Sequence, residues 1–284
     1  MKQRTLTGVV LALLSMVLLG CFHLPWVPKL IAFLLGCGVV WEILGANGIR
    51  NKGSYAAGLF LAVIIPIFSL TEKVWWMAAA LVLGLGFFTY LMTRIGKQAP
   101  AWVAAPEIVL ALCLYRGLAC YGEIPHGAFF LCLTGLICAL TDIFAYLVGS
   151  RFGRHKLAPK VSPGKSIEGA LGGLGVTVVL IALVFGRFFD DIGTLMLYTA
   201  VVSILGQFGD LSMSAVKRVA GVKDFGHIFP GHGGILDRFD SLMYPLAFTW
   251  LLYCAQGWIF AYSGLAPLSG SHFYTNNSST VPKL

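Results

Sequence analysis

Long uninterrupted runs of apolar residues, separated by short polar segments, make up most of the chain. A run of roughly 18 to 20 apolar residues is enough to cross a bilayer as a helix. Runs of this kind predict spans near residues 5–22, 29–46, 54–70, 74–93, 101–119, 128–149, 169–187, 194–212 and 241–262. The pattern therefore predicts an all-α fold: a polytopic integral membrane protein of about nine transmembrane helices.

The first apolar run, residues 5–22, has an alternative interpretation as a cleaved signal peptide, because Lys2 and Arg4 precede it. The run is long, however, and the sequence that follows from Cys21 lacks the small residues of a cleavage site. We therefore interpret it as a spanning helix.

The composition agrees with a membrane protein, and the charges indicate its orientation. Hydrophobic residues make up 58% of the chain and charged residues 11%, which excludes an ordinary soluble domain. The formal net charge is +8, but the cations lie between apolar runs, so nucleic acid is not an expected partner. With a cytoplasmic N-terminus, the cytoplasmic segments hold fifteen Lys and Arg residues and the other side five. We expect a multi-pass protein of the plasma (inner) membrane, with its N-terminus and the loops 150–168 and 211–240 in the cytoplasm.

Polar chemistry is concentrated between residues 210 and 240, which hold four of the twelve carboxylates and four of the twenty Lys and Arg residues. If the preceding helix continues into this stretch, one of its faces carries Ser203, Gln207, Asp210, Ser214 and Lys217. The Gly231-His232-Gly233-Gly234 turn then lets backbone amides approach an anion closely. Carboxylates, cations and amides together predict a site for a metal-bound polyphosphate.

The fixed positions of this stretch are Ser214-x-Val216-Lys217-Arg218-x4-Lys223-Asp224-x-Gly226-x-x-Phe229-Pro230-x-His232-Gly233-Gly234-Ile235-x-Asp237-Arg238-Phe239-Asp240. This run closely resembles the signature of the phosphatidate cytidylyltransferases, also called CDP-diacylglycerol synthases. The resemblance implies a CTP-dependent nucleotidyltransferase of phospholipid biosynthesis. Such an enzyme transfers CMP from CTP to phosphatidate, a membrane lipid, and gives CDP-diacylglycerol and pyrophosphate.

The resemblance also implies metal ligands. Asp210 and Asp237 are expected to ligate Mg²⁺, which bridges the triphosphate and offsets charge on the leaving pyrophosphate. Asp142, Asp224 and Asp240 are further candidates, although an aspartate just before a helix, as Asp240 is, can serve simply as its N-terminal cap.

Groups that would bind phosphate form a second set. The cations expected to bind the triphosphate and the lipid phosphate are Lys217, Arg218, Lys223 and Arg238, of which we expect at least one to be structural. His232 is expected to donate to phosphate rather than act as a base, because phosphatidate is already an anionic nucleophile. The amides of Gly233 and Gly234 and the hydroxyl of Ser214 are further candidates, with a merely polar helix face as the alternative for Ser214.

The basic loop 150–168 holds a second motif, Ser162-Pro163-Gly164-Lys165-Ser166-Ile167-Glu168-Gly169. It resembles a Ser-Pro-x-Lys-Thr-x-x-Gly stretch of the same family, with Ser166 in place of Thr and Ile167 where Trp is common. Ser162 and Lys165, near the start of a predicted helix, are candidate substrate-binding residues. A topology determinant or a patch for anionic lipid is the alternative. Met213, where the family often carries Glu, leaves the preferred lipid open.

Two intramembrane carboxylates complete the candidates, because a charge buried in a bilayer is costly without a partner. Asp142 is predicted to face the substrate site, with pairing to a basic residue as the alternative. Glu42 is a functional candidate, with pairing to a loop cation such as Arg50 as an equally good alternative.

The predicted organisation is an N-terminal set of transmembrane helices (1–100), a transmembrane catalytic region (101–262) and a polar C-terminal tail (263–284). Alternative functions are a CTP-dependent transferase for another membrane lipid or prenol, and an anion transporter with Asp142 and Asp210 as midplane ion sites. A transporter predicts inverted repeats, which the sequence lacks. A scaffold gives no reason to hold so many charges at one membrane edge. The sequence leaves a homodimer open.

Overall fold

The computed structural model describes residues 17, 20, 21, 24, 26–67, 75–95, 104–121, 127–189, 191–226, 228 and 233–255. Most of these residues form helices: α2 (Trp26–Ala46), α3 (Lys52–Ile67), α4 (Trp75–Arg94), α5 (Ala104–Cys120), α6 (Gly127–Phe152), α7 (Ile167–Phe185), the short helix η4 (Gly186–Phe188), α8 (Ile192–Ala220), α9 (Leu236–Phe239) and α10 (Met243–Ala255). The strands β1 (Lys156–Ala158) and β2 (Ser162–Ser166) form a two-stranded ribbon between α6 and α7.

The helices support a membrane protein but not the full number of expected spans. Each span expected from residue 29 onward corresponds to a helix: α2, α3, α4, α5, α6, α7, α8 and α10 in turn. Within the described residues, four helices are long and apolar enough to cross a membrane, namely α2, α6, α7 with its η4 extension, and α8. The first expected span, 5–22, and the end of the last one lie largely outside the described residues. Nine spans are therefore not confirmed.

The described residues are mostly helical, as expected for an all-α membrane protein, and the ribbon is an addition that the sequence did not predict. In the loop 150–168, Lys156 lies opposite Ser166 and Ala158 opposite Ser162 in an antiparallel pair. The sequence predicted the start of a helix near Ser162 and Lys165, and no strand. Because Pro163 favours an extended backbone at Ser162, this stretch can pair as a strand instead. The helix then begins after Ser166, whose hydroxyl accepts from the Gly169 amide at 3.1 Å.

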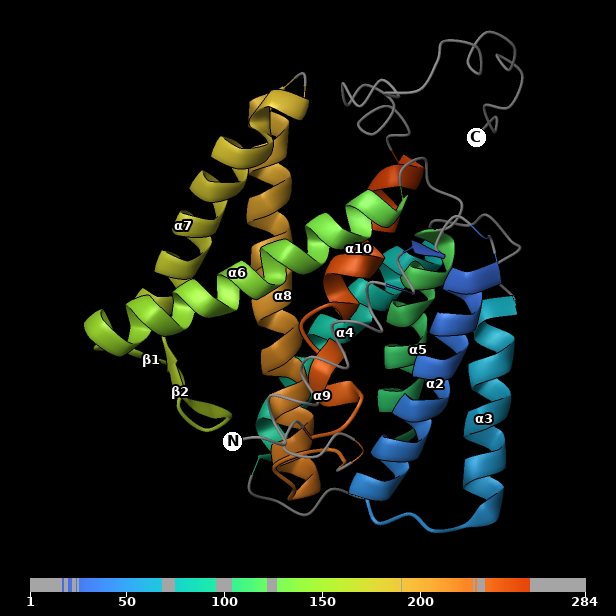
Figure 1. Ribbon diagram of the computed structural model, residues 1–284. Coiled ribbons are helices and arrows are strands. Elements are labelled where there is room, and N and C mark those ends of the chain that lie inside the picture. The colour runs from blue at the N-terminus through green and yellow to red at the C-terminus, as the bar shows by residue number, and fades with distance from the viewer. Residues whose placement is uncertain are drawn as a thin grey trace, which may run out of the picture.

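Figure 1 shows how the helices are arranged. The upright helices α2, α3 and α5 lie on one side, α8 runs through the middle, and α6 crosses α8 obliquely. Helix α7 packs against α6 and α8, and α10 packs against α5 and α8. The C-terminal end of α8, the helix α9 and the ribbon lie toward the same end of the molecule (Figure 1). This end is where the candidate residues gather.

Hydrogen bonds between buried hydroxyl groups connect the helices inside the apolar core. The Tyr198 hydroxyl of α8 lies 2.8 Å from the Thr134 hydroxyl of α6 and 3.0 Å from that of Thr249 on α10. Nearer the site, Thr141 of α6 donates to the Ser203 hydroxyl of α8 at 2.9 Å. Since unpaired polar groups are costly in such surroundings, these bonds favour one register of the helices.

Helices α6 and α7 cross with their backbones in close contact, because glycines of α7 face α6. A Cβ atom at Gly169 would lie 2.6 Å from the carbonyl oxygen of Ala145, and one at Gly173 would lie 2.7 Å from that of Thr141. Small residues that allow such an approach are typical of packed membrane helices.

We expect Gly173→Ala to destabilise the protein, since its new methyl group must push α7 away from the α6 backbone. Overpacking of this kind costs about 1–3 kcal/mol. Thermal unfolding of the purified protein in detergent measures the loss. Gly175→Ala is the matched control on the same helix, because nothing lies within 4 Å of its Cβ position. Equal melting temperatures for the two variants would contradict the close crossing.

Candidate active site

Helix α8 carries the polar face that the sequence predicts. The helix begins at Asp191, whose carboxylate accepts from the amides of Gly193 and Thr194. It ends at Gly221, a left-handed cap with φ of 72°. The helix is continuous from Ile192 to Ala220, which confirms that it passes through the polar stretch. Asp210 and Lys217 therefore project from one rigid element.

Lys217 forms an ion pair with Asp237, just after the glycine turn. Lys217 Nζ lies 2.8 Å from Asp237 Oδ1, and the two side chains are 12% and 5% exposed. The other carboxylate oxygen accepts from the amides of Phe225 and Gly234, each at 2.9 Å. Burial raises the pKa of Asp237, but the bond from Lys217 and these amides outweigh burial and hold the pKa below its usual value. Gly233, with φ of 82°, supplies the turn that brings the Gly234 amide to this carboxylate.

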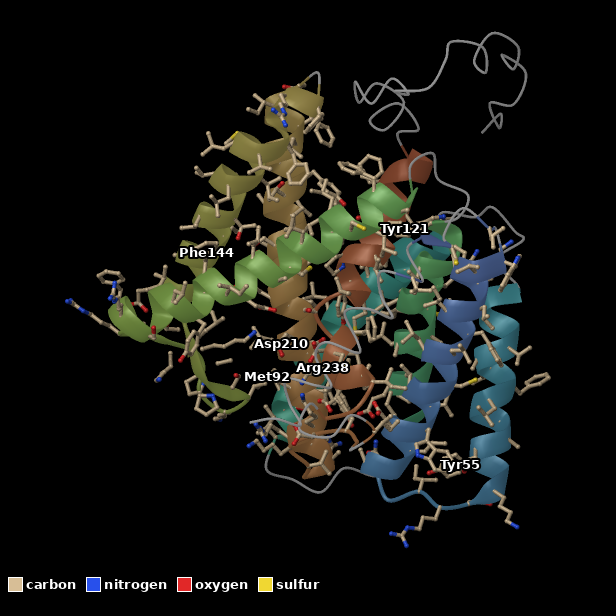
Figure 2. The ribbon with its side chains drawn as sticks, viewed as in Figure 1. Tyr55, Met92, Tyr121, Phe144, Asp210 and Arg238 are labelled. Atoms are coloured by element: carbon tan, nitrogen blue, oxygen red, sulfur yellow. The ribbon has the colours of Figure 1, made fainter. Side chains whose placement is uncertain are left out.

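A second ion pair joins the ribbon to α8. Lys165 of β2 pairs with the Asp210 carboxylate, and both side chains are 26% exposed. Asp142 of α6 lies within electrostatic range of both Lys165 and Asp210. The predicted second motif and the predicted metal ligand thus meet in space, 45 positions apart in the chain. Figure 2 labels Asp210 on α8 and Arg238 on α9.

Asp240 lies close to both ion pairs, Lys217–Asp237 and Lys165–Asp210, and is buried. Its side chain lies close enough to Asp210, Lys217 and Asp237 to be influenced by their charges. Burial, followed by the negative charge of Asp210, raises the pKa of Asp240 to about 7. Its carboxylate accepts from the Ser241 amide at 2.8 Å, ahead of the start of α10 at Met243. Near neutral pH this group therefore adds less negative charge than Asp237 does.

We call Asp142, Asp210, Asp237 and Asp240 the aspartate cluster. Its carboxylate oxygens are the ligands that Mg²⁺ prefers. Four aspartates here face two lysines, Lys165 and Lys217, which leaves an excess of negative charge. Among the described residues, no three His, Cys, Asp or Glu side chains are arranged to hold a metal ion. In this arrangement Asp210 and Asp237 each bind a lysine. The donor type thus suits a divalent cation, while the donor geometry is that of ion pairs.

Most of the remaining predicted site residues in the described part of the chain make no hydrogen bond or ion pair with the aspartate cluster. Arg218 Nε donates to the Val161 carbonyl at 3.1 Å, so Arg218 attaches the ribbon to α8. Lys223, Asp224 and Arg238 are exposed. Within the described part of the chain, they make no hydrogen bond or ion pair with the aspartate cluster. Ser214 donates to Asp210 over a long 3.5 Å, and Ser162 is half-buried in β2. His232 lies outside the described residues.

Glu42 binds the backbone at the start of α9, a role that its place in the sequence did not predict. Its carboxylate accepts from the Ile235 amide at 2.6 Å and from the Leu236 amide at 2.7 Å. Arg50, the expected alternative partner, is not the group it binds. The amides of residues 234, 235 and 236 therefore all bind carboxylates of this chain. The only signal in the sequence was the costly position of Glu42 within an apolar run.

Comparisons with known proteins agree on one family. Residues 2–255 match the model of the cytidylyltransferase family. The chain is 37% identical to the phosphatidate cytidylyltransferase of Staphylococcus haemolyticus, over 87% of this chain and 96% of that protein. It is 36% identical to the protein of that name from Staphylococcus epidermidis and 35% identical to the one from Staphylococcus aureus, with the same coverage.

Proposed function

The chain belongs to the cytidylyltransferase family, and from this premise we propose that it transfers CMP from CTP to phosphatidate. The products are CDP-diacylglycerol and pyrophosphate. The observation that carries the proposal is the aspartate cluster with its two lysines, which brings residues of both recognised motifs together at one end of the membrane helices. Relatives named phosphatidate cytidylyltransferase support the choice of lipid.

The chemistry is a displacement at phosphorus. An anionic phosphate oxygen of phosphatidate forms a bond to the α-phosphorus of CTP, and the bond from that phosphorus to the bridging oxygen breaks as pyrophosphate leaves. No proton must move to the protein, so catalysis depends on positioning and charge. A divalent metal, which we propose is Mg²⁺ held by Asp210 and Asp237, would supply charge neutralisation of the triphosphate.

The lysines of the site would bind phosphate oxygens. Lys165 and Lys217 approach the aspartates from different elements, the ribbon and α8. Their ammonium groups suit the phosphates of CTP and of the lipid through charge-assisted hydrogen bonds. His232 is proposed as a further donor from the glycine turn, and Lys223 and Arg238 as cations at the exposed margin.

We place the site on the cytoplasmic side of a plasma membrane. Support comes from the distribution of fifteen and five cations between the two sides, and from relatives that are bacterial. The cytoplasm is also where nucleoside triphosphates are available.

The proposed function predicts a specific lipid product. Purified protein in detergent with Mg²⁺ and CTP labelled at the α-phosphorus should form labelled CDP-diacylglycerol when phosphatidate is added. Parallel reactions with other phospholipids and with a polyprenol should remain unlabelled. If the polyprenol is labelled and phosphatidate is not, the acceptor of CMP is the prenol. If the folded protein labels none of these lipids, the proposed transferase activity is refuted.

A further inference from the structure

Glu42 of α2 is hydrogen-bonded to the backbone at residues 235 and 236, within the family signature. Glu42 is only 2% exposed, and its carboxylate binds two amides that follow it by 193 and 194 positions in the chain. The two bonds are short for N–H donors, at 2.6 and 2.7 Å, and each carboxylate oxygen accepts from one amide. The amides are those of Ile235 and Leu236, where α9 begins, and helix starts have unsatisfied N–H groups.

Glycines make room for this carboxylate. A Cβ atom on Gly226 would lie 2.8 Å from Glu42 Oε1, and one on Gly234 would overlap the Glu42 carboxylate. One turn earlier on α2, a Cβ on Gly38 would lie 2.6 Å from the Ile235 side chain. Two glycines of the signature and one of α2 thus leave the space in which helix and loop meet.

The bonds of Glu42 lead, through the backbone next to them, to the ion pair of Asp237 with Lys217. Glu42 binds the amides of residues 235 and 236, the adjacent Gly234 amide binds Asp237, and Asp237 binds Lys217. Asp237 is one residue beyond the second amide, so the position of its backbone depends on both Glu42 bonds. Helix α9 contacts α2 directly, and Asp237 of α9 is joined to α8 through its ion pair with Lys217.

We infer that Glu42 is a positioning residue for the transfer reaction: through the amides of Ile235 and Leu236 it holds Asp237 in the orientation that the site requires. This inference rests on the proposed function. Glu42 itself does not touch the reacting atoms, because both of its carboxylate oxygens already bind backbone. Its role is that of a residue that orients a proposed metal ligand through hydrogen bonds. Loss of such a residue typically costs about 10- to 100-fold in activity or metal affinity.

The test compares three substitutions on α2. Glu42→Gln keeps the shape of the side chain but presents an NH₂ group to one of the two amides, so at least one bond is lost. Glu42→Asp keeps the charge and is shorter by one methylene group. Gly45→Ala is the matched control, because nothing lies within 4 Å of its Cβ position.

With saturating phosphatidate, kcat of Glu42→Gln should fall about 10- to 100-fold while the KM for phosphatidate stays within about twofold. The kcat of Glu42→Asp should lie between those of Glu42→Gln and wild type, and the kcat of Gly45→Ala should equal that of wild type. Hydrogen exchange of residues 233–240 should rise in Glu42→Gln while exchange of α6 is unchanged. If Glu42→Gln does not fold, the same two readouts on Glu42→Asp decide.

The outcomes separate this inference from the proposed function. Wild type without transfer activity refutes the proposed function, and the exchange of residues 233–240 still tests the contact. Active wild type with an equally active, folded Glu42→Gln overturns the positioning role. Unchanged exchange of residues 233–240 overturns it as well.

Discussion

Asp237→Asn should abolish nearly all CMP transfer, with a loss of at least about a thousandfold in kcat. The amide cannot supply the charge that a metal ligand needs, and it no longer neutralises the Lys217 ammonium 2.8 Å away. The lowered pKa of Asp237 means that the native group is ionised throughout the neutral range. Initial rates with CTP labelled at the α-phosphorus measure the loss.

This variant needs a control for folding, because the Asp237–Lys217 pair is nearly buried. Removing one partner of a buried pair typically costs about 3–5 kcal/mol of stability, whereas removing both costs far less. The double variant Asp237→Asn with Lys217→Met should therefore regain stability in a detergent melt and stay inactive. Asp191→Asn, at the other end of α8, should keep full activity, since asparagine also caps helices. Recovery of activity in the double variant would contradict a catalytic role for Asp237.

Asp210→Asn should reduce kcat about 10²- to 10³-fold, the usual value of a group that stabilises charge in a transition state. It should also raise the Mg²⁺ concentration that gives half of the maximal rate. Stability should change little, because Asp210 and Lys165 are both partly exposed and such pairs contribute about 1 kcal/mol or less. Rates measured over a Mg²⁺ titration test both effects.

Lys165→Gln separates the ligand from its ion-pair partner. The proposed role of Lys165 is to bind phosphate, so its loss should raise the KM for CTP and leave the Mg²⁺ requirement unchanged. If Asp210→Asn and Lys165→Gln shift the Mg²⁺ requirement equally, Asp210 acts only as the partner of Lys165.

The sequence could predict what depends on a single element. The spacing from Ser203 to Lys217 is helical and contains no breaker, so α8 and its polar face followed directly. The apolar runs likewise predicted the positions of α2 to α8 and of α10. The signature contains Asp237, and Asp210 lies only four positions before it begins at Ser214, so both candidates are close together in the chain.

The sequence could not predict contacts between distant elements. Lys165 meets Asp210 only because the ribbon folds against α8, where Arg218 binds the Val161 carbonyl. The strands were missed because Ser162-Pro163-Gly164 has the composition of a turn, while strand pairing depends on the partner strand. The partners of Glu42 are backbone amides, which every residue but proline possesses, so no residue type signals them.

The fate of the phosphorus atoms of CTP tests the central claim most directly. Paired reactions with phosphatidate should use CTP labelled at the α-phosphorus in one and at the γ-phosphorus in the other. We predict that α-label enters lipid, that γ-label appears in pyrophosphate in equal amount, and that neither product forms with Asp237→Asn. Entry of γ-label into lipid, or release of pyrophosphate without phosphatidate, would contradict CMP transfer to this lipid at this site.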